Sequence, residues 1–144
     1  QLRGRVGGRR RLADLPGYGY AKVPQDLKRD WHALIDNYVR ERQALSGMVV
    51  VSDIRHALTD FDQQMLAYCR ARQLRCVLLL SKSDKLSRGA AMETRRKVLR
   101  EIEDMGVLTE VVVFSAHSKA GLAEARRALA ALLDQPAEHQ ESSE

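Results

Sequence analysis

Cysteine, proline and aromatic residues are scarce in this chain of 144 residues, which has two Cys, three Pro and 5% aromatic residues. Cys69 and Cys76 have no metal-ligand spacing, so we expect buried free thiols. No apolar stretch approaches the ~18 residues that a membrane span needs. No apolar segment follows the arginine-rich start, so no signal peptide is expected. These absences favour a globular protein in a reducing cytoplasm.

The dipeptide Gly-Lys is also absent. A phosphate-binding loop of the form G-x-x-x-x-G-K-[ST] requires that dipeptide, so the glycines near the start of the chain do not form one. The first threonine is Thr59. We expect an irregular basic segment over residues 1–11, one domain over 12–134 and a disordered polar tail over 135–144.

Positive charge is in excess. The chain has 24 Lys and Arg residues and 19 Asp and Glu residues, which gives a net charge of +5. Arginines gather in the first eleven residues and again along residues 95–100. Such an excess favours an anionic partner such as RNA. The same runs can also be ordinary solvated helix faces.

Short apolar runs alternate with stretches of helical period along the chain. Four runs have the length of strands: Arg10–Asp14, Met48–Val51, Cys76–Leu80 and Val111–Phe114. Strands that alternate with helices predict an α/β fold with a parallel sheet covered by helices.

The stretches between the runs predict helices with recognisable ends. From Pro24 onward, five apolar residues share one helix face: Leu27, Trp31, Leu34, Ile35 and Tyr38. Thr59 is a candidate N-cap, with Asp62 three residues later. Ser87 opens a helix that runs to about Met105, with Gly106 as its C-cap. The last helix contains Leu122 to Leu133.

Polar motifs follow three of the strand candidates. Asp14-Leu15-Pro16-Gly17 opens a glycine-rich turn, Ser81-Lys82-Ser83-Asp84 follows the third run, and Ser115-Ala116 follows the fourth. The carboxyl ends of parallel strands lie at one edge of the sheet, where open α/β proteins bind ligands. We therefore expect these motifs to come together.

DxPG, [NTS]KxD and SA, in this order with helices between them, resemble the GTP-binding half of a Ras-like GTPase. The longer run DLPGYGYAKV, followed by Val51-Ser52-Asp53-Ile54-Arg55-His56, resembles the EngB (YihA) branch of bacterial ribosome-assembly GTPases. The resemblance covers roughly residues 12–134. It implies a three-layer Ras-like P-loop GTPase fold with a mostly parallel sheet, here without the first strands and first helix.

The resemblance places the guanine base at the second and third motifs. A carboxylate such as Asp84 can accept hydrogen bonds from the ring N–H and the exocyclic amine of guanine, whereas adenine offers the wrong pattern. Lys82 would lay its aliphatic stem across the base, and Ser81, where Asn or Thr is commoner, would tie the loop to a neighbouring segment. Ala116 would donate its N–H to the guanine carbonyl oxygen, with Ser115 shaping the turn.

The remaining site residues carry implied or default roles. His117 follows Ala116 in the base-binding segment and is by default a solvent-exposed loop histidine. Asp14 would hold Mg²⁺ through water, and Gly17 would donate its N–H to the γ-phosphate, with Leu15 and Pro16 shaping the turn between them. Tyr18 stands where Ras-like proteins carry a glutamine that orients the attacking water.

By the same resemblance, the ligands are GTP and GDP with Mg²⁺, and the partner is the large ribosomal subunit with its ribosomal RNA. The role implied is subunit assembly linked to cell division and septation in the bacterial cytoplasm, with no DNA or membrane partner. Without a phosphate-binding loop, the chain as given is expected to hydrolyse GTP negligibly.

The missing central strand would leave two apolar sheet edges. Either the N-terminal segment fills the gap, or the chain dimerises through these edges, or it is marginally stable.

Two alternatives from other classes remain open on the residues alone. The chain could be a nucleotide-free module that binds RNA or the ribosome. It could also be an unrelated doubly wound domain in which Asp14 and Asp53 serve a phosphate or metal reaction. Guanine binding without adenine binding would distinguish the GTPase-like reading from both.

Overall fold

The computed structural model describes residues 3–5, 11–13, 33–34, 36–37 and 45–134. The chain divides into two compact units, residues 1–45 and residues 46–144. The candidate guanine-binding motifs belong to the second unit. None of the described helices is long and apolar enough to cross a membrane.

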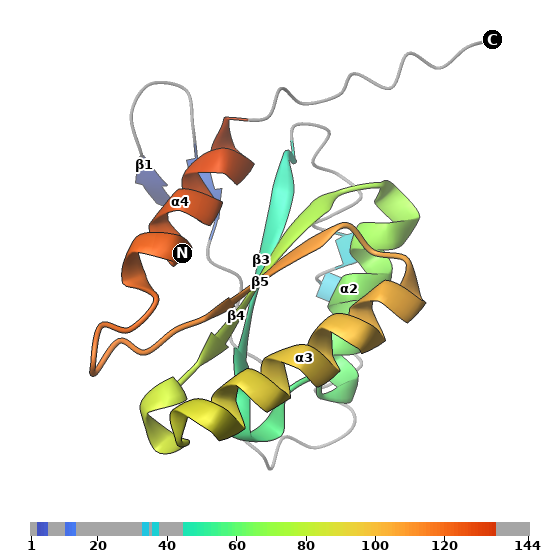
Figure 1. Ribbon diagram of the computed structural model, residues 1–144. Helices are drawn as coiled ribbons and strands as arrows, with labels where there is room; N and C mark the ends of the chain where they lie inside the picture. Colours follow the sequence, from blue (N-terminus) through green and yellow to red (C-terminus); the bar gives the residue numbers. More distant parts are fainter. Residues whose placement is uncertain (1–2, 6–10, 14–32, 35, 38–44, 135–144) are drawn as a thin grey trace, which may run out of the picture. The chain divides into compact units, whose positions relative to one another are not determined.

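The sheet of the second unit contains three parallel strands in the order β3-β4-β5 (Figure 1). These strands are β3 (Gly47–Asp53), β4 (Arg75–Ser81) and β5 (Thr109–Val113). Each is one to three residues longer than the apolar run that predicted it. This α/β architecture, with a parallel sheet flanked by helices, confirms the predicted fold class and is consistent with part of a Ras-like GTPase fold.

The helices are α2 (Asp60–Arg72), α3 (Arg88–Met105) and α4 (Leu122–Leu133). Two short 3₁₀ turns lie just after β3 and β4: η1 (Ile54–His56) follows β3 directly, and η2 (Ser83–Lys85) follows β4 after one residue. These two strands therefore end in tight turns, so the side chains that follow them stay close to the sheet edge.

The predicted helix ends are confirmed. Thr59 and Asp62 form a reciprocal capping box at the start of α2, with N···O distances of 3.2 Å in both directions. Ser87 caps α3 by accepting a hydrogen bond from the Ala90 N–H at 3.2 Å. Gly106 ends α3 in the left-handed conformation, which glycine adopts without strain.

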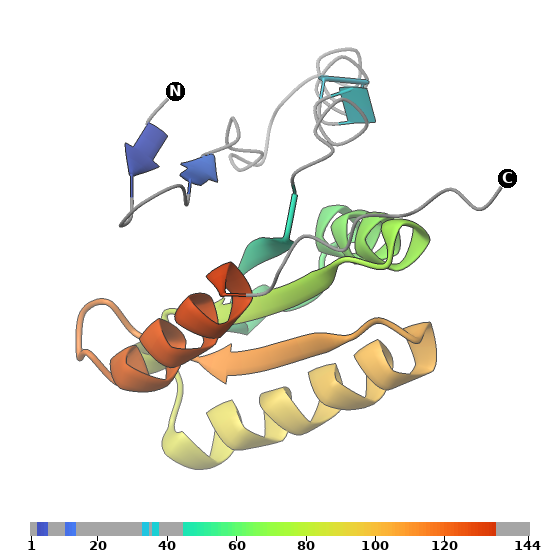
Figure 2. The same ribbon diagram turned by 90° about the horizontal axis from the view of Figure 1, so that it is seen from above.

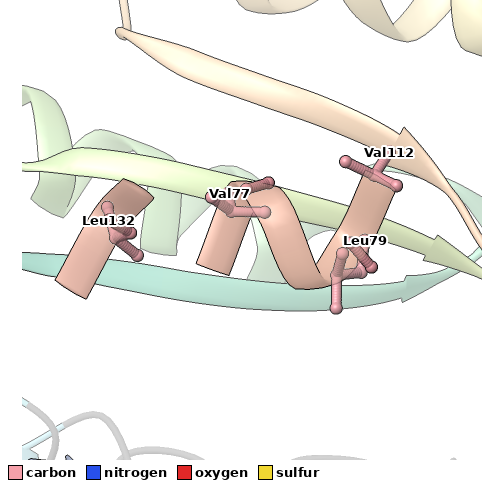
Figure 3. Close-up of a cluster of buried hydrophobic side chains, with 6 residues drawn as sticks. Val77, Leu79, Val112 and Leu132 are labelled. Atoms are coloured by element: carbon pink, nitrogen blue, oxygen red, sulfur yellow. The ribbon is translucent and has the colours of Figure 1, made fainter. Parts of the chain in front are cut away.

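One face of the sheet packs against α4, as Figure 3 shows. A cluster of buried hydrophobic side chains from β4, β5 and α4 lies there. Its members are Val77, Leu79, Val112, Ala125, Ala128 and Leu132. Burying a side chain of valine or leucine size contributes about 1.5–3 kcal/mol, so this cluster is a main source of stability for the unit.

The opposite face carries the alternate residues of the same strands, because successive side chains of a strand point to opposite sides. Cys76, Leu78 and Leu80 of β4 are buried there. Helices α2 and α3 cover this side of the sheet, whereas α4 covers the other (Figure 1). The Sγ atom of Cys69 in α2 lies 3.7 Å from the Sδ atom of Met48. Cys69 and Cys76 are free and buried, as predicted.

The first unit contains a pairing that the sequence did not predict. Residues 1–11 were expected to be irregular, but β1 (Arg3–Arg5) pairs in antiparallel fashion with β2 (Arg11–Ala13) (Figure 2). The predicted strand Arg10–Asp14 therefore exists as β2. A short connection is enough to reach an antiparallel neighbour.

The helix predicted from Pro24 onward falls mostly outside the described residues. Residues 33–34 and 36–37 are helical, in agreement with the pattern. Leu34, which was assigned to the apolar face, is nevertheless 54% exposed. Trp31 and the tail over residues 135–144 lie outside the described residues.

Candidate functional site

The carboxyl ends of β3, β4 and β5 meet at one edge of the sheet. The register pairs Asp53 with Ser81 and Leu80 with Val113. The ladder continues past the strand ends, because the Phe114 N–H donates to the Leu80 carbonyl at 2.8 Å. The structure thus brings the Ser81–Asp84 and Ser115–Ala116 motifs side by side, as the sequence predicted.

A side-chain hydrogen bond joins the two motifs directly. The Ser115 hydroxyl donates to Oδ1 of Asp84 at 2.8 Å. Ser115 has no exposed surface, and its Oγ also accepts the N–H of Ser118 at 3.0 Å. The buried serine therefore fixes the exposed carboxylate of Asp84 and organises its own turn.

Main-chain hydrogen bonds hold the same two loops together. The Ser83 N–H donates to the Phe114 carbonyl at 3.1 Å, and the Ser115 N–H donates to the Ala120 carbonyl at 3.0 Å. Gly121 closes the second loop with φ of +71°, and an added Cβ would lie 1.9 Å from the Val113 oxygen. Only glycine fits this position without moving the backbone that supports the site.

The electrostatic environment keeps Asp84 ionised. The Ser115 hydroxyl lowers the pKa of the Asp84 carboxyl below its usual value, and the nearby Lys85 and His117 act in the same direction. A hydrogen bond to the charged form of a carboxyl favours that form. At neutral pH Asp84 is therefore an anionic acceptor, which is the state that recognition of two N–H donors requires.

Ser81 ties the loop after β4 to the neighbouring strand, as predicted. Its hydroxyl donates to the Ser52 carbonyl of β3 at 3.1 Å. Lys82 follows in the left-handed conformation, with φ of 59° and ψ of 35°. This is uncommon for a residue with a Cβ. The turn redirects the chain so that Asp84 lies beside Ser115.

Ala116 and His117 are exposed in the turn after β5. Asp14, Leu15, Pro16 and Gly17, the predicted magnesium and phosphate residues, lie outside the described residues, so their placement stays a prediction. Within the described parts of the chain, no group of three or more His, Cys, Asp or Glu side chains could hold a metal ion.

A surface cavity of about 280 Å³ lies at the opposite edge of the sheet. It is lined by the first residues of β4 and β5 and by the end of α4, including Arg75, Leu108 and Ala131. It shares no residue with the motifs at the carboxyl edge and is separate from the candidate site.

Three relatives are similar to most of the chain. The probable GTP-binding protein EngB of Stenotrophomonas maltophilia (strain K279a) is 53% identical over 116 residues, which is 80% of this chain and 58% of that protein. The proteins of the same name from Xanthomonas euvesicatoria pv. vesicatoria (strain 85-10) and Xanthomonas campestris pv. campestris (strain 8004) are 51% and 52% identical, over 86% and 81% of this chain and 60% and 57% of theirs. Over four fifths or more of its length, the chain is thus similar to proteins named EngB.

The chain spans a little under three fifths of the length of the first of these relatives and a similar share of the others. No family model matches it. The similarity to these relatives extends far beyond the short motifs and supports the resemblance that the motifs indicated.

Sequence reasoning missed three contributors to the site of this chain. Ser118 and Phe114 act through the main chain, which leaves no mark in the sequence. Asp53 was noted only as a candidate for another reaction. Its position at the end of a predicted parallel strand was the available signal. A parallel register places the ends of neighbouring strands together, and it pairs Asp53 with Ser81.

Proposed function

We propose that the chain binds guanine nucleotides, GTP and GDP, through the carboxyl edge of its parallel sheet. The observation that carries the proposal is the Ser115–Asp84 hydrogen bond of 2.8 Å, which joins two sequence motifs and presents an ionised carboxylate at the strand ends. The names of the relatives, which call them GTP-binding proteins, support the same ligand.

In this proposal, Asp84 accepts the ring N–H and the exocyclic amine of guanine. Ala116 donates its N–H to the carbonyl oxygen of the base, and the stem of Lys82 covers one face of the ring. Charge-assisted hydrogen bonds of this kind are shorter and stronger than neutral ones. Adenine is rejected because it would leave the Asp84 acceptors without donors.

The experiment is calorimetric titration of the purified chain with GDP and with ADP, both with Mg²⁺. We expect GDP to bind and ADP not to bind. Asp84→Asn should abolish the preference. Asp104→Asn, in the last turn of α3 at the opposite edge of the sheet, removes a comparable exposed carboxylate and should leave binding unchanged. Equal binding of ADP and GDP, or no binding of either, would refute the proposal.

Magnesium belongs to the proposal through Asp14, which would hold the ion through water while the ion neutralises phosphate charge. The sequence contains no Gly-Lys dipeptide. We therefore expect this chain to hydrolyse GTP negligibly even where it binds. Turnover above a Mg²⁺ blank that Asp84→Asn abolishes would contradict this expectation.

A second part of the proposal concerns partners. The net charge of +5 favours an anionic partner such as RNA. The resemblance implies that this partner is the large ribosomal subunit with its RNA, with a role in subunit assembly, cell division and septation in the bacterial cytoplasm. RNA affinity should fall steeply with salt concentration. A nucleotide-free binding module would show this affinity without any effect of GDP, whereas the GTPase-like proposal expects GDP to change it.

The alternative metal or phosphate reaction at Asp53 is less well supported. Its carboxylate lies 2.8 Å from Arg55 and 3.4 Å from Lys82. A metal ion at this position would have to displace two cations.

A further inference from the structure

Asp53 ends β3 and holds a cation on either side. Its Oδ1 accepts the N–H and the Nε–H of Arg55 at 2.9 and 3.1 Å, and its Oδ2 accepts Nη2 of Arg55 at 2.8 Å. The same Oδ2 lies 3.4 Å from the ammonium nitrogen of Lys82. The carboxylate thus accepts hydrogen bonds from Arg55 of its own turn and also lies close to Lys82, which directly follows the next strand.

The parallel register accounts for this second contact. Asp53 pairs with Ser81, so the side chain of the following residue, Lys82, emerges next to the end of β3. The Ser81 hydroxyl closes the same gap through its bond to the Ser52 carbonyl. The side chain of Lys82 is 59% exposed, and its ammonium end lies beside Asp53.

We propose that Asp53 is a positioning residue for the guanine site, which draws the ammonium of Lys82 toward β3 and so lays the lysine stem across the strand ends. This inference rests on the proposed function, because it names the residue that prepares Lys82 for the base. A long lysine side chain loses rotamer freedom when it covers a ligand. Asp53 removes part of that freedom before the nucleotide arrives, which strengthens binding by preorganisation.

Arg55 keeps Asp53 suited to this role. Its bidentate fork fixes the carboxylate plane, and its charge helps to lower the pKa of Asp53 well below the usual range. Asp53 therefore stays ionised throughout the neutral range. An ion pair without a positioning role would share this geometry. Its removal, however, would not change nucleotide affinity in a way that depends on the presence of Lys82.

The test is a double-mutant cycle on the full chain, with GDP affinity measured by calorimetry. The variants are Asp53→Asn, Lys82→Met and the combination of both. Glu93→Gln is the matched control, because Glu93 also pairs with an arginine, Arg96, on the exposed side of α3. We expect Asp53→Asn to weaken GDP binding about threefold, the size of effect that an exposed ion pair allows. In the Lys82→Met background the same change should have no effect.

Two further measurements separate positioning from folding. Asp53→Glu, which keeps the carboxylate, should restore most of the affinity. Lys82→Met should raise the pKa of Asp53, measured by carboxyl carbon chemical shifts, because Lys82 contributes to lowering it.

The outcomes distinguish failure of the proposed function from failure of the positioning role. If the unmodified chain does not bind GDP, the proposed function fails, and this inference fails with it. If the chain binds GDP but Asp53→Asn matches Glu93→Gln, or weakens binding equally with and without Lys82, the positioning role alone is overturned. A threefold loss that depends on Lys82 supports it.

Discussion

At the scale of single residues, Ser115 connects the two halves of the candidate site. Its hydroxyl donates to Asp84 and accepts from the Ser118 main chain, and the residue has no exposed surface. A buried polar group that satisfies two partners is costly to remove, because each partner must find a replacement. Ser115 thus supplies a hydrogen-bond bridge, whereas the neighbouring Ala116 is the residue proposed to contact the base.

We predict that Ser115→Ala lowers the free energy of unfolding by about 1–2 kcal/mol, since the two hydrogen bonds of the buried hydroxyl are lost. Urea denaturation would measure the change. Ser118→Ala is the control, because the exposed Ser118 hydroxyl makes only a long contact of 3.4 Å with the Ala120 N–H. An equal effect of both variants would show that the Ser115 bridge has no special importance.

The ionisation of Asp84 gives a prediction about pH. Its pKa is lower in the folded chain than in the unfolded chain, chiefly through Ser115. A carboxyl of this kind contributes stability above its unfolded pKa of about 3.9, and that contribution is lost as pH falls through the folded pKa. In Ser115→Ala the pKa of Asp84 should rise toward the unfolded value. NMR titration would check this, and an unchanged pKa would contradict it.

At the scale of secondary-structure elements, the turn before α4 is built around a glycine with positive φ. Gly121 and Gly106 have nearly the same φ, +71° and +70°, but different surroundings. An added Cβ at Gly106 would meet nothing within 4 Å, whereas at Gly121 it would meet the Val113 carbonyl oxygen. The comparison separates backbone strain from collision with β5.

We expect Gly106→Ala to cost about 1 kcal/mol of stability, from backbone strain alone. Gly121→Ala should cost about 2–4 kcal/mol, because strain adds to overpacking against the strand end. It should also weaken GDP binding, since Val113 precedes the Phe114 carbonyl that holds Ser83. Thermal and urea unfolding of the two variants would measure the difference, and equal losses would argue against the collision.

At the scale of the whole molecule, β3 forms one edge of the parallel sheet in the part of the chain that the structure describes. Among the described residues, β3 pairs only with β4, and Val51 on β3 is 61% exposed. An apolar edge strand is a template for another strand. The three-stranded sheet is also small for a domain of this class, so a further strand would add apolar burial on the face that carries Val51.

We predict that the chain self-associates reversibly as its concentration rises, through this edge. Val51→Lys should shift the equilibrium toward the monomer, because charged side chains discourage pairing at sheet edges, and it should leave folding intact because the position is exposed. Sedimentation velocity over a range of concentrations would measure the self-association of the unmodified chain and of the Val51→Lys variant. Leu108→Lys, at an exposed position outside β3, is the matched control. A monomer at all concentrations would contradict the prediction.

Local sequence patterns were enough to predict much of this protein. The apolar runs located β3, β4 and β5, because strands of a parallel sheet covered by helices carry continuous apolar residues. The expectation that Met48–Val51 would be buried on both faces was wrong for Val51, which is 61% exposed. Thr59, Asp62, Ser87 and Gly106 located helix ends, because capping depends on residues within one turn. The motifs at the strand ends also predicted that Ser81–Asp84 and Ser115 would meet, since parallel strands align their carboxyl ends.

Tertiary structure decided what depends on which neighbour a strand or side chain finds. The antiparallel pairing of β1 with β2 was not predicted, because no local pattern records which partner a strand finds. The bridge from Ser115 to Asp84 and the reach of Asp53 to Lys82 span 31 and 29 positions of the chain, respectively. The sequence by itself determined the elements and the kinds of side chain at their ends. Only the folded register determined which of those side chains touch, because hydrogen bonds and ion pairs act over a few ångströms of space, whatever their separation along the chain.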